Sequence, residues 1–179
     1  MDNKDQVAVF GGGCLWCTEA VFAELKGVVS VVPGYAGGHT ENPTYAQVCR
    51  DDTGHAEVIK LEFDPSLITY NQLPAVFFAS HDPTTLNRQG ADRGTHYRSI
   101  ILYTSDDKKD QAEAFIRELD DSGSKGSPVV TELVKLEQFY EAEAEHKQFY
   151  FDKPAVMYCQ IVISPKVKKV REEFAEHIR

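Results

Sequence analysis

The chain consists of short blocks in which apolar residues run together, alternate with polar ones or recur at helical spacing. The first block, Val7-Ala8-Val9-Phe10, is continuously apolar and predicts a short buried strand. Four further apolar residues recur on one face of a helix: Leu15, Val21, Phe22 and Leu25. The three glycines at 11–13 separate these blocks and are typical of a turn. The pattern therefore predicts a strand, a glycine turn and a helix whose first turn contains Cys14.

The rest of the chain continues this mixture of periods. β-Branched or alternating segments predict strands at residues 28–32, 56–63, 98–103, 129–136 and 158–163. Amphipathic segments predict helices at residues 69–80, 106–119 and 139–150, and from Pro165 onward. Residues 81–98 show no period, and loops of this length inside a domain are usually functional or disordered. The mixture predicts an α+β fold, an α/β sandwich with a mixed sheet and flanking helices.

Composition and charge exclude several classes of protein. A length of 179 residues predicts one domain, 1–179, and the 42 % of hydrophobic residues is ordinary for a globular protein. A formal net charge of −9 argues against nucleic acid or an anionic membrane as a partner. The N-terminus is polar, and no apolar stretch approaches the roughly 18 residues of a membrane span. We therefore expect a cytoplasmic protein, in which the basic residues at 166–171 form a solvated helix face.

Cys14 is the first candidate for chemistry. The N-terminus of a helix carries unpaired N–H groups and a partial positive charge, and both favour the thiolate, which is the nucleophilic form of cysteine. The preceding glycines allow other backbone or a substrate to come close. The alternative is that Cys14 is a buried small hydrophobic residue, as many free cysteines are.

Cys14 and Cys17 form a C-x-x-C pair, which has two interpretations. Residues three apart share a helix face, so the pair can form a strained, easily reduced disulfide. The pair is also half of a zinc site, although zinc would need two more ligands and no second cysteine pair is present. Cys49 and Cys159 stand alone in the sequence. In a reducing compartment, these thiols are more consistent with catalysis, metal binding or burial than with a disulfide framework.

Other polar and aromatic residues have both a structural and a catalytic interpretation. Glu57 is either an exposed carboxylate at a strand end or an acid whose pKa is raised in an apolar pocket. Asp92 and Tyr97 belong either to an ordinary polar loop or to a hydrogen-bonding site. Tyr45 is either a surface aromatic residue or a phenol donor. Trp16 either fills the core or forms a wall beside the Cys14 sulfur.

Taken in order, these segments resemble one family, the A-type peptide methionine sulfoxide reductases. The resemblance covers residues 11–103 and continues more weakly to Tyr158-Cys159. Gly12-Gly13-Cys14-Leu15-Trp16 is similar to the Gly-Cys-Phe-Trp signature of the family. The other matching blocks are VPGYAGG at 32–38, NPTY at 42–45, TGHAE at 53–57, HDPT at 81–84 and QGADRGTHYRS at 89–99. Several blocks in order are far more specific than one short motif.

The resemblance implies a role for each of these side chains. Cys14 would be the nucleophile that attacks methionine S-sulfoxide, and Glu57 would be the acid that protonates or hydrogen-bonds the sulfoxide oxygen. Tyr45 and Tyr97 would donate to the same oxygen or its bridging water, and Asp92 would help to hold the site. The implied fold is an α/β sandwich related to the ferredoxin-like plait, without cofactor or metal. The implied partners are free and protein-bound methionine sulfoxide and thioredoxin or another dithiol reductant, and we expect a monomer.

The chain departs from the family pattern in two places. Leu15 stands where the family usually has Phe, beside Trp16 in the wall for the substrate S-methyl group. We expect altered substrate binding without loss of activity, because Leu is also large and apolar. Many relatives carry the recycling thiol in a glycine-rich tail, which this sequence does not show. Cys17 is then expected to condense with the Cys14 sulfenic acid; Cys159 and direct reduction of a single cysteine are the alternatives.

Two rival functions also remain open from the sequence. A general thiol–disulfide oxidoreductase would use Cys14 and Cys17 but would not need Glu57 or the tyrosines. A sulfoxide-binding module would need the pocket but would not turn over its ligand. Release of methionine from its sulfoxide separates both from the reductase interpretation.

Overall fold

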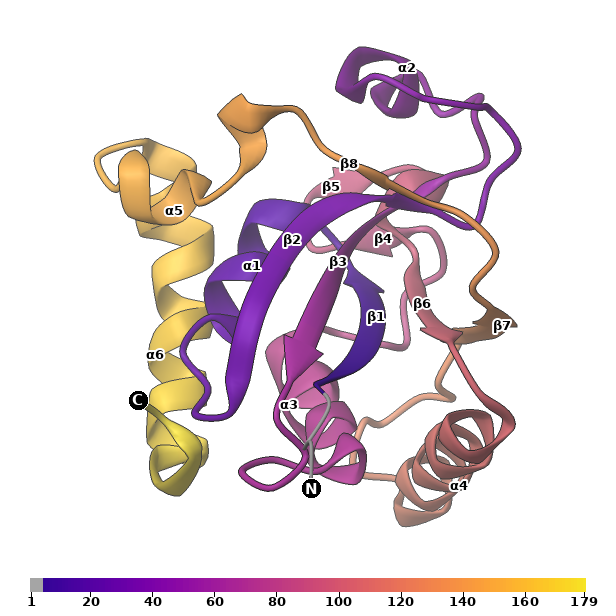
Figure 1. Ribbon diagram of the computed structural model, residues 1–179, viewed down its shortest axis with the longest axis vertical. Coiled ribbons are helices and arrows are strands. Elements are labelled where there is room, and N and C mark those ends of the chain that lie inside the picture. Colours follow the sequence, from indigo (N-terminus) through magenta and orange to yellow (C-terminus); the bar gives the residue numbers. More distant parts are fainter. Residues whose placement is uncertain (1–4) are drawn as a thin grey trace.

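Six strands form one sheet in the order β7-β6-β1-β3-β2-β8 (Figure 1). The structure is a computed structural model that describes residues 5–179. The strands are β1 (Gln6–Gly12), β2 (Val28–Ala36), β3 (Ala56–Phe63), β6 (Ser99–Tyr103), β7 (Glu132–Lys135) and β8 (Phe139–Glu141). β6 and β7 run parallel, whereas the other neighbours in the sheet are antiparallel. The expected mixed sheet is therefore confirmed.

The centre of the sheet is a ferredoxin-like plait. Along the chain, β1, α1 (Leu15–Phe22), β2, β3, α3 (Leu73–Ser80) and β6 follow one another as β-α-β-β-α-β. Their strands lie in the order β6-β1-β3-β2, and all are antiparallel to their neighbours. Helices α1 and α3 pack on the same face of this sheet, since both contribute to the hydrophobic cluster that contains Phe10. The α+β fold expected from the sequence is thus observed.

The remaining elements surround this plait. The longer helices are α4 (Asp106–Ser122) and α6 (Ser164–Glu173), and α6 lies beside α1 (Figure 1). The short elements are α2 (Tyr45–Cys49), β4 (Arg88–Gln89), β5 (Asp92–Arg93), α5 (Phe149–Asp152), the 3₁₀ turns Tyr70–Gln72, Thr95–Tyr97, Ala144–His146 and Ala175–His177, and the π-helical turn Cys159–Ile163. Among the described residues, no helix combines the length and the apolar character that crossing a membrane requires.

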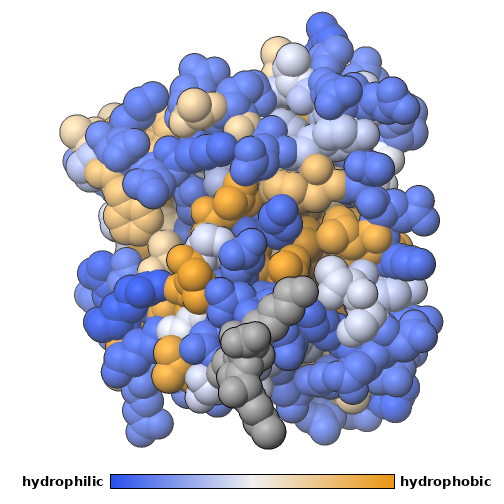
Figure 2. All heavy atoms as spheres, viewed as in Figure 1, coloured by the Kyte–Doolittle hydropathy of each residue, from blue (hydrophilic) through white to orange (hydrophobic). Residues whose placement is uncertain are grey.

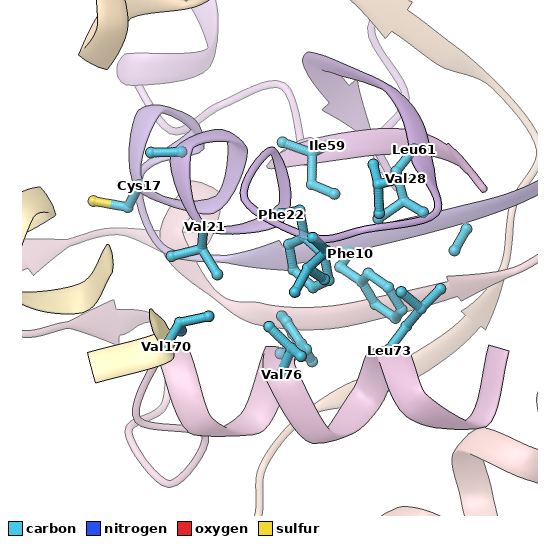
Figure 3. Packing of buried hydrophobic residues seen from close by; sticks show 14 of the residues in the cluster. Phe10, Cys17, Val21, Phe22, Val28, Ile59, Leu61, Leu73, Val76 and Val170 are labelled. Atoms are coloured by element: carbon cyan, nitrogen blue, oxygen red, sulfur yellow. The ribbon is translucent and has the colours of Figure 1, made fainter. Parts of the chain in front are cut away.

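Phe10 lies in the middle of the larger hydrophobic cluster (Figure 3). Its ring stacks on Phe22 of α1 with 5.5 Å between centroids, and on Phe77 of α3 with 5.0 Å. The ring is completely buried, as are Ile59 and Leu61 on the neighbouring strand. The strand that ends at the glycine turn is therefore fixed by packing immediately before Cys14.

We predict that Phe10→Ala lowers the free energy of unfolding by about 3–5 kcal/mol, since it removes a buried ring and leaves a cavity. Urea unfolding followed by circular dichroism measures this change. Leu86→Ala is the control, because that side chain is 70 % exposed and its loss is expected to change stability by less than about 0.5 kcal/mol. Equal effects of the two substitutions would contradict the packing described here.

The first half of β3 is buried on both faces of the sheet. Residues 56–59 are all buried, so the half-buried pattern that the alternation predicts for residues 56–63 is found only in the second half of the strand. The second face carries a smaller hydrophobic cluster: Val9, Ala36, Ala56, Val58, Ile100 and Leu102. Figure 2 shows hydrophobic residues in the middle of the face viewed in Figure 1, surrounded by hydrophilic ones. Glu57 is therefore buried, and its interpretation as an exposed strand-end carboxylate is wrong.

Two predicted elements near the C-terminus are wrong. The expected helix at 139–150 is replaced by strand β8, a 3₁₀ turn and the short helix α5, because residues 139–141 pair with the edge of β2. The expected strand at 158–163 is a π-helical turn that leads directly into α6. Its buried residues Cys159 and Ile163 are four apart, a helical spacing that a continuous apolar run conceals.

Candidate active site

The candidate site begins where β1 ends in the glycine turn. Gly13 has φ +99°, a conformation that residues with a side chain rarely adopt. A Cβ atom on Gly12 would lie 2.9 Å from the His81 ring, so the strand end packs directly against this side chain. Cys14 follows as the N-cap of α1, and its carbonyl oxygen accepts hydrogen bonds from the N–H groups of Cys17 and Thr18. The predicted strand, turn and helix are confirmed.

Cys14 is buried, with only 6 % of its surface exposed. Burial raises the pKa of its thiol well above the usual value, and the neighbouring Cys17 and Glu57 add to the increase. The N–H of Trp16, in the first turn of α1, acts in the opposite direction and lowers the pKa. The expected effect of the helix N-terminus is therefore present, but desolvation outweighs it and Cys14 is protonated in the folded protein at neutral pH.

Cys17 lies at the edge of the hydrophobic cluster (Figure 3). It forms a thiol pair with Cys14. The hydrogen bond with Cys14 lowers the pKa of Cys17 to about 7, although burial opposes this change. The charge of Lys166 and the hydroxyl of Tyr158, whose Oη lies 3.6 Å from the Cys17 sulfur, lower it further. Within this C-x-x-C pair, the pKa of Cys17 is therefore lowered and that of Cys14 is raised.

Among the described residues, neither cysteine of this pair belongs to a cluster of metal-ligand type. Within residues 5–179, one group of three possible metal ligands has its ligand atoms close together: Glu143, Glu145 and His146. The described part of the chain therefore supplies no further ligand to a zinc site that would include Cys14 and Cys17.

Glu57 lies on β3 with 1 % of its surface exposed. Its Oε1 accepts a hydrogen bond from the N–H of Leu15 at 3.3 Å, whereas Oε2 has no hydrogen-bond partner among the described residues. Burial raises the pKa of Glu57 to about 8, the Leu15 hydrogen bond opposes the increase, and the charges of Asp92 and Cys17 add to it. Oε2 lies 3.8 Å from Nε2 of His96, beyond hydrogen-bond distance. Glu57 is therefore a protonated acid at neutral pH, with one oxygen that makes no hydrogen bond.

An aromatic cluster lies next to Cys14. The Trp16 indole stacks on Phe149 with 3.7 Å between ring centroids and an interplanar angle of 5°. Its Nε1 donates to Nδ1 of His146 at 3.2 Å, and the His146 ring lies 4.1 Å from that of Tyr45. Tyr158 meets the indole edge-on, with 6.0 Å between centroids. Such a wall suits a small apolar group such as a methyl bound to sulfur.

The structure brings Tyr45, Tyr97 and Asp92 to the same site. Burial raises the pKa of both phenols far above the usual value, and the charge of Glu57 is the next cause for each of them. Both are therefore neutral phenols close enough to Glu57 for its charge to act on them. Asp92, on β5, accepts a hydrogen bond from Oη of Tyr158 at 2.7 Å, which connects it to the hydroxyl beside Cys17.

Leu15 lies beside the aromatic wall, and its expected effect on substrate binding stays a prediction. Its side chain is completely buried, in a small cluster with Tyr35, Val48 and Ala142. Trp16 and Tyr45 pack against this cluster, so Leu15 supports the aromatic wall from behind. Its direct contribution to the site is the backbone N–H that binds Glu57.

The two remaining cysteines differ in their surroundings. All four cysteines are free thiols in this structure. Cys159 is completely buried in the larger hydrophobic cluster, where burial raises the pKa of its thiol. Cys49 is exposed on α2 and hydrogen-bonds with the side chain of Tyr45. The thiol that interacts directly with Cys14 is that of Cys17.

Sequence reasoning assigned no role to three residues of the site: His146, Phe149 and Tyr158. All three come from the segment whose secondary structure was predicted wrongly, more than a hundred residues after Trp16. A general enrichment of aromatic residues between 139 and 158 was the available signal, but nothing in their spacing indicates a partner so distant in sequence.

The comparisons with known proteins agree with this geometry. Residues 6–178 match the family model described as peptide methionine sulfoxide reductase. Peptide methionine sulfoxide reductase MsrA of Sulfolobus acidocaldarius is 56 % identical over 171 residues, which cover 96 % of each chain. Among solved structures, methionine sulfoxide reductase A of Corynebacterium diphtheriae has a TM-score of 0.81 at 32 % identity, covering 86 % of this chain and 77 % of that one. Reduced Mxr1 of Saccharomyces cerevisiae has a TM-score of 0.80 at 30 % identity, with 89 % and 91 % covered. Because the family model matches residues 6–178 and the archaeal relative is 56 % identical over 96 % of each chain, the chain belongs to the peptide methionine sulfoxide reductase family.

Proposed function

We propose that the chain reduces methionine S-sulfoxide, free and within proteins, with Cys14 as the nucleophile and Glu57 as the acid. One observation carries the assignment of roles: Glu57 is buried, protonated at neutral pH and has an Oε2 without a hydrogen bond, 3.8 Å from His96 Nε2. It also lies close enough to Cys14 for its charge to raise the thiol pKa. A sulfoxide oxygen placed at Oε2 would supply the missing hydrogen-bond partner. Its sulfur would then lie in the neighbourhood of Cys14.

The chemistry follows from this placement. A sulfoxide sulfur becomes electrophilic when its oxygen receives a proton or strong hydrogen bonds, which Glu57, Tyr45 and Tyr97 would supply. The Cys14 sulfur attacks the sulfoxide group, and its thiol proton replaces the proton that Glu57 gives to the oxygen. The S–O bond of the substrate breaks, and the oxygen is retained on Cys14 as a sulfenic acid. The substrate sulfur is reduced to that of methionine while the Cys14 sulfur is oxidised, so no external electron donor is needed in this step.

The aromatic cluster would select the substrate. We assign the substrate S-methyl group to the face beside Trp16, since this wall is apolar and lies two residues from Cys14 in the first turn of α1. Asp92 would hold Tyr158 and the polar side of the pocket. Leu15 would act through its N–H on Glu57 and through packing behind the wall.

Cys17 is the thiol that we assign to the second step. It pairs with Cys14 and carries the lower pKa, so its thiolate can attack the sulfenic acid, form the Cys14–Cys17 disulfide and release water. Cys159 is the alternative, but it lies buried in the hydrophobic cluster. A dithiol such as thioredoxin would then reduce the disulfide by exchange. The yeast protein Mxr1 has been crystallised in complex with Trx2.

We predict that Cys17→Ser releases one equivalent of methionine but stops at the sulfenic acid. Each protein is mixed with methionine S-sulfoxide without reductant, and methionine and the protein mass are measured. The unchanged protein is expected to release one methionine per chain and lose two hydrogens as a disulfide forms. Cys17→Ser is expected to gain one oxygen that dimedone traps. Cys159→Ser is the control and should still form the disulfide; a disulfide in Cys17→Ser would instead assign the second step to another thiol.

The setting of this reaction also forms part of the proposal. We propose that the chain acts as a monomer and as one domain over residues 1–179; the single six-stranded sheet of the described residues supports one domain. A cytoplasmic location agrees with four free cysteines, since reducing compartments keep thiols unpaired.

A further inference from the structure

Glu19 is a second buried carboxyl group near Cys14 that the proposed reaction does not use. It lies on α1, five residues after Cys14, and only 2 % of its surface is exposed. No ion pair of Glu19 is found among the described residues, and its Oε1 has no hydrogen-bond partner there. A buried carboxyl group is costly for a fold, so its contacts indicate what it stabilises.

The contacts of Glu19 lead to the beginning of α5. Its carboxyl group accepts hydrogen bonds from the backbone N–H groups of Gln148 and Phe149. Gln148 has a left-handed conformation, φ 54°, and its own side chain does not cap the helix. The first N–H groups of a helix need an acceptor, and α5, from Phe149 to Asp152, is too short to be stable alone. Glu19 therefore supplies from α1 the cap that α5 lacks.

This turn carries the residue that covers Trp16. Phe149 follows Gln148 directly and lies flat against the indole, while His146 accepts the hydrogen bond from Nε1. The upstream end of the same segment is held by Glu143, which accepts hydrogen bonds from the Tyr35 hydroxyl at 3.1 Å and from the Tyr45 N–H at 3.0 Å. Two carboxyl groups thus fix the ends of the segment that forms one side of the aromatic cluster.

We propose that Glu19 is a positioning residue for the substrate pocket: it holds the Gln148–Phe149 turn so that Phe149 stays stacked on Trp16. The expected effect on the kinetics rests on the proposed function, because that function assigns Trp16 as the wall for the substrate S-methyl group. Glu19 contacts no reacting atom in this scheme. Its loss should therefore weaken substrate binding and leave the chemical step at saturation largely unchanged.

The test is a single-turnover measurement of methionine release at increasing concentrations of methionine S-sulfoxide. Glu19→Ala is expected to raise the half-saturating concentration by about tenfold, with a limiting rate within about twofold of the unchanged protein. Glu19→Gln keeps an acceptor oxygen at the same place and should restore most of the affinity. Glu113→Ala is the control, because Glu113 is exposed on α4. If Glu19→Ala does not fold, Glu19→Asp, which draws the carboxyl group back by one methylene, should show a smaller change of the same kind.

The fluorescence of Trp16 provides a second measurement, since this is the one tryptophan of the chain. Without any substrate, Glu19→Ala should shift the emission to the red and increase quenching by acrylamide, while Glu19→Gln and Glu113→Ala should not. Unchanged emission in Glu19→Ala, or a fall in the limiting rate alone, would overturn the inference. Absence of methionine release by the unchanged protein would overturn the proposed function instead, and the emission would still test the placement of Phe149.

Discussion

Cys14→Ser is expected to abolish methionine release, lowering the single-turnover rate by at least about a thousandfold. In the proposed reaction, the sulfur of Cys14 attacks the substrate and then carries its oxygen. A serine hydroxyl is a far weaker nucleophile at neutral pH and cannot be oxidised to a sulfenic acid. The measurement is methionine release from a stoichiometric amount of methionine S-sulfoxide, followed by chromatography.

The environment of Cys14 makes this effect specific. The thiol is buried and has a raised pKa, so a high reactivity toward oxidants in solution does not set Cys14 apart from the other cysteines. Cys49→Ser is the matched control, because it removes an exposed thiol and keeps a hydroxyl beside Tyr45. It should release methionine at the unchanged rate. Residual release by Cys14→Ser above the background without protein would show that another group attacks the sulfoxide.

Glu57→Gln is expected to slow the single-turnover rate by about 10²–10⁴-fold, the range usual for loss of a general acid. The amide still accepts the Leu15 hydrogen bond and fills the same volume, but it has no acidic proton for the sulfoxide oxygen. The half-saturating concentration should change much less, because protonation develops in the transition state. A single-turnover rate equal to that of the unchanged protein would exclude Glu57 as the acid.

The pH dependence gives an independent test of the same residue. Burial raises the pKa of Glu57 to about 8, so the acid form is lost as the pH rises through that value. We expect the dependence of the rate on pH to contain a descending limb near pH 8 that is absent in Glu57→Gln. The unfolded chain loses the same proton near the usual pKa of 4.5, so it binds fewer protons than the folded chain between these values. The contribution of Glu57 to folding stability therefore falls as the pH rises from 4.5 to 8, and Glu57→Gln should remove this slope.

The local part of the site could be predicted from the sequence. The glycine turn before Cys14 is encoded within a few neighbouring residues, and φ +99° at Gly13 is the conformation that such a turn requires. The α+β fold follows from the predicted mixture of strands and helices, and the observed plait has this fold. These features depend on hydrophobic periods and turn residues, which are set by residues close together in the sequence.

The remaining features depend on contacts between distant segments. The pattern at 139–141 is ambiguous and predicts a helix, whereas pairing with the edge of β2 makes the segment a strand. The pKa of Cys14 was expected to be lowered, since the helix N-terminus is visible in the sequence while the burial of the thiol is not. The same reason hides Phe149, whose partner Trp16 lies far away in the chain.

The separation between these partners has a consequence for the synthesis of the protein. Trp16 and His146 are 130 positions apart, and a ribosome adds about 5–20 residues per second. The strand and helix that carry Cys14 therefore emerge on the order of ten seconds before the segment that covers them. During this interval the thiol is present without its aromatic cover. We expect nascent chains to be more sensitive to oxidants at Cys14 than finished molecules, so that a cell under oxidative stress would damage this protein most while it is being made.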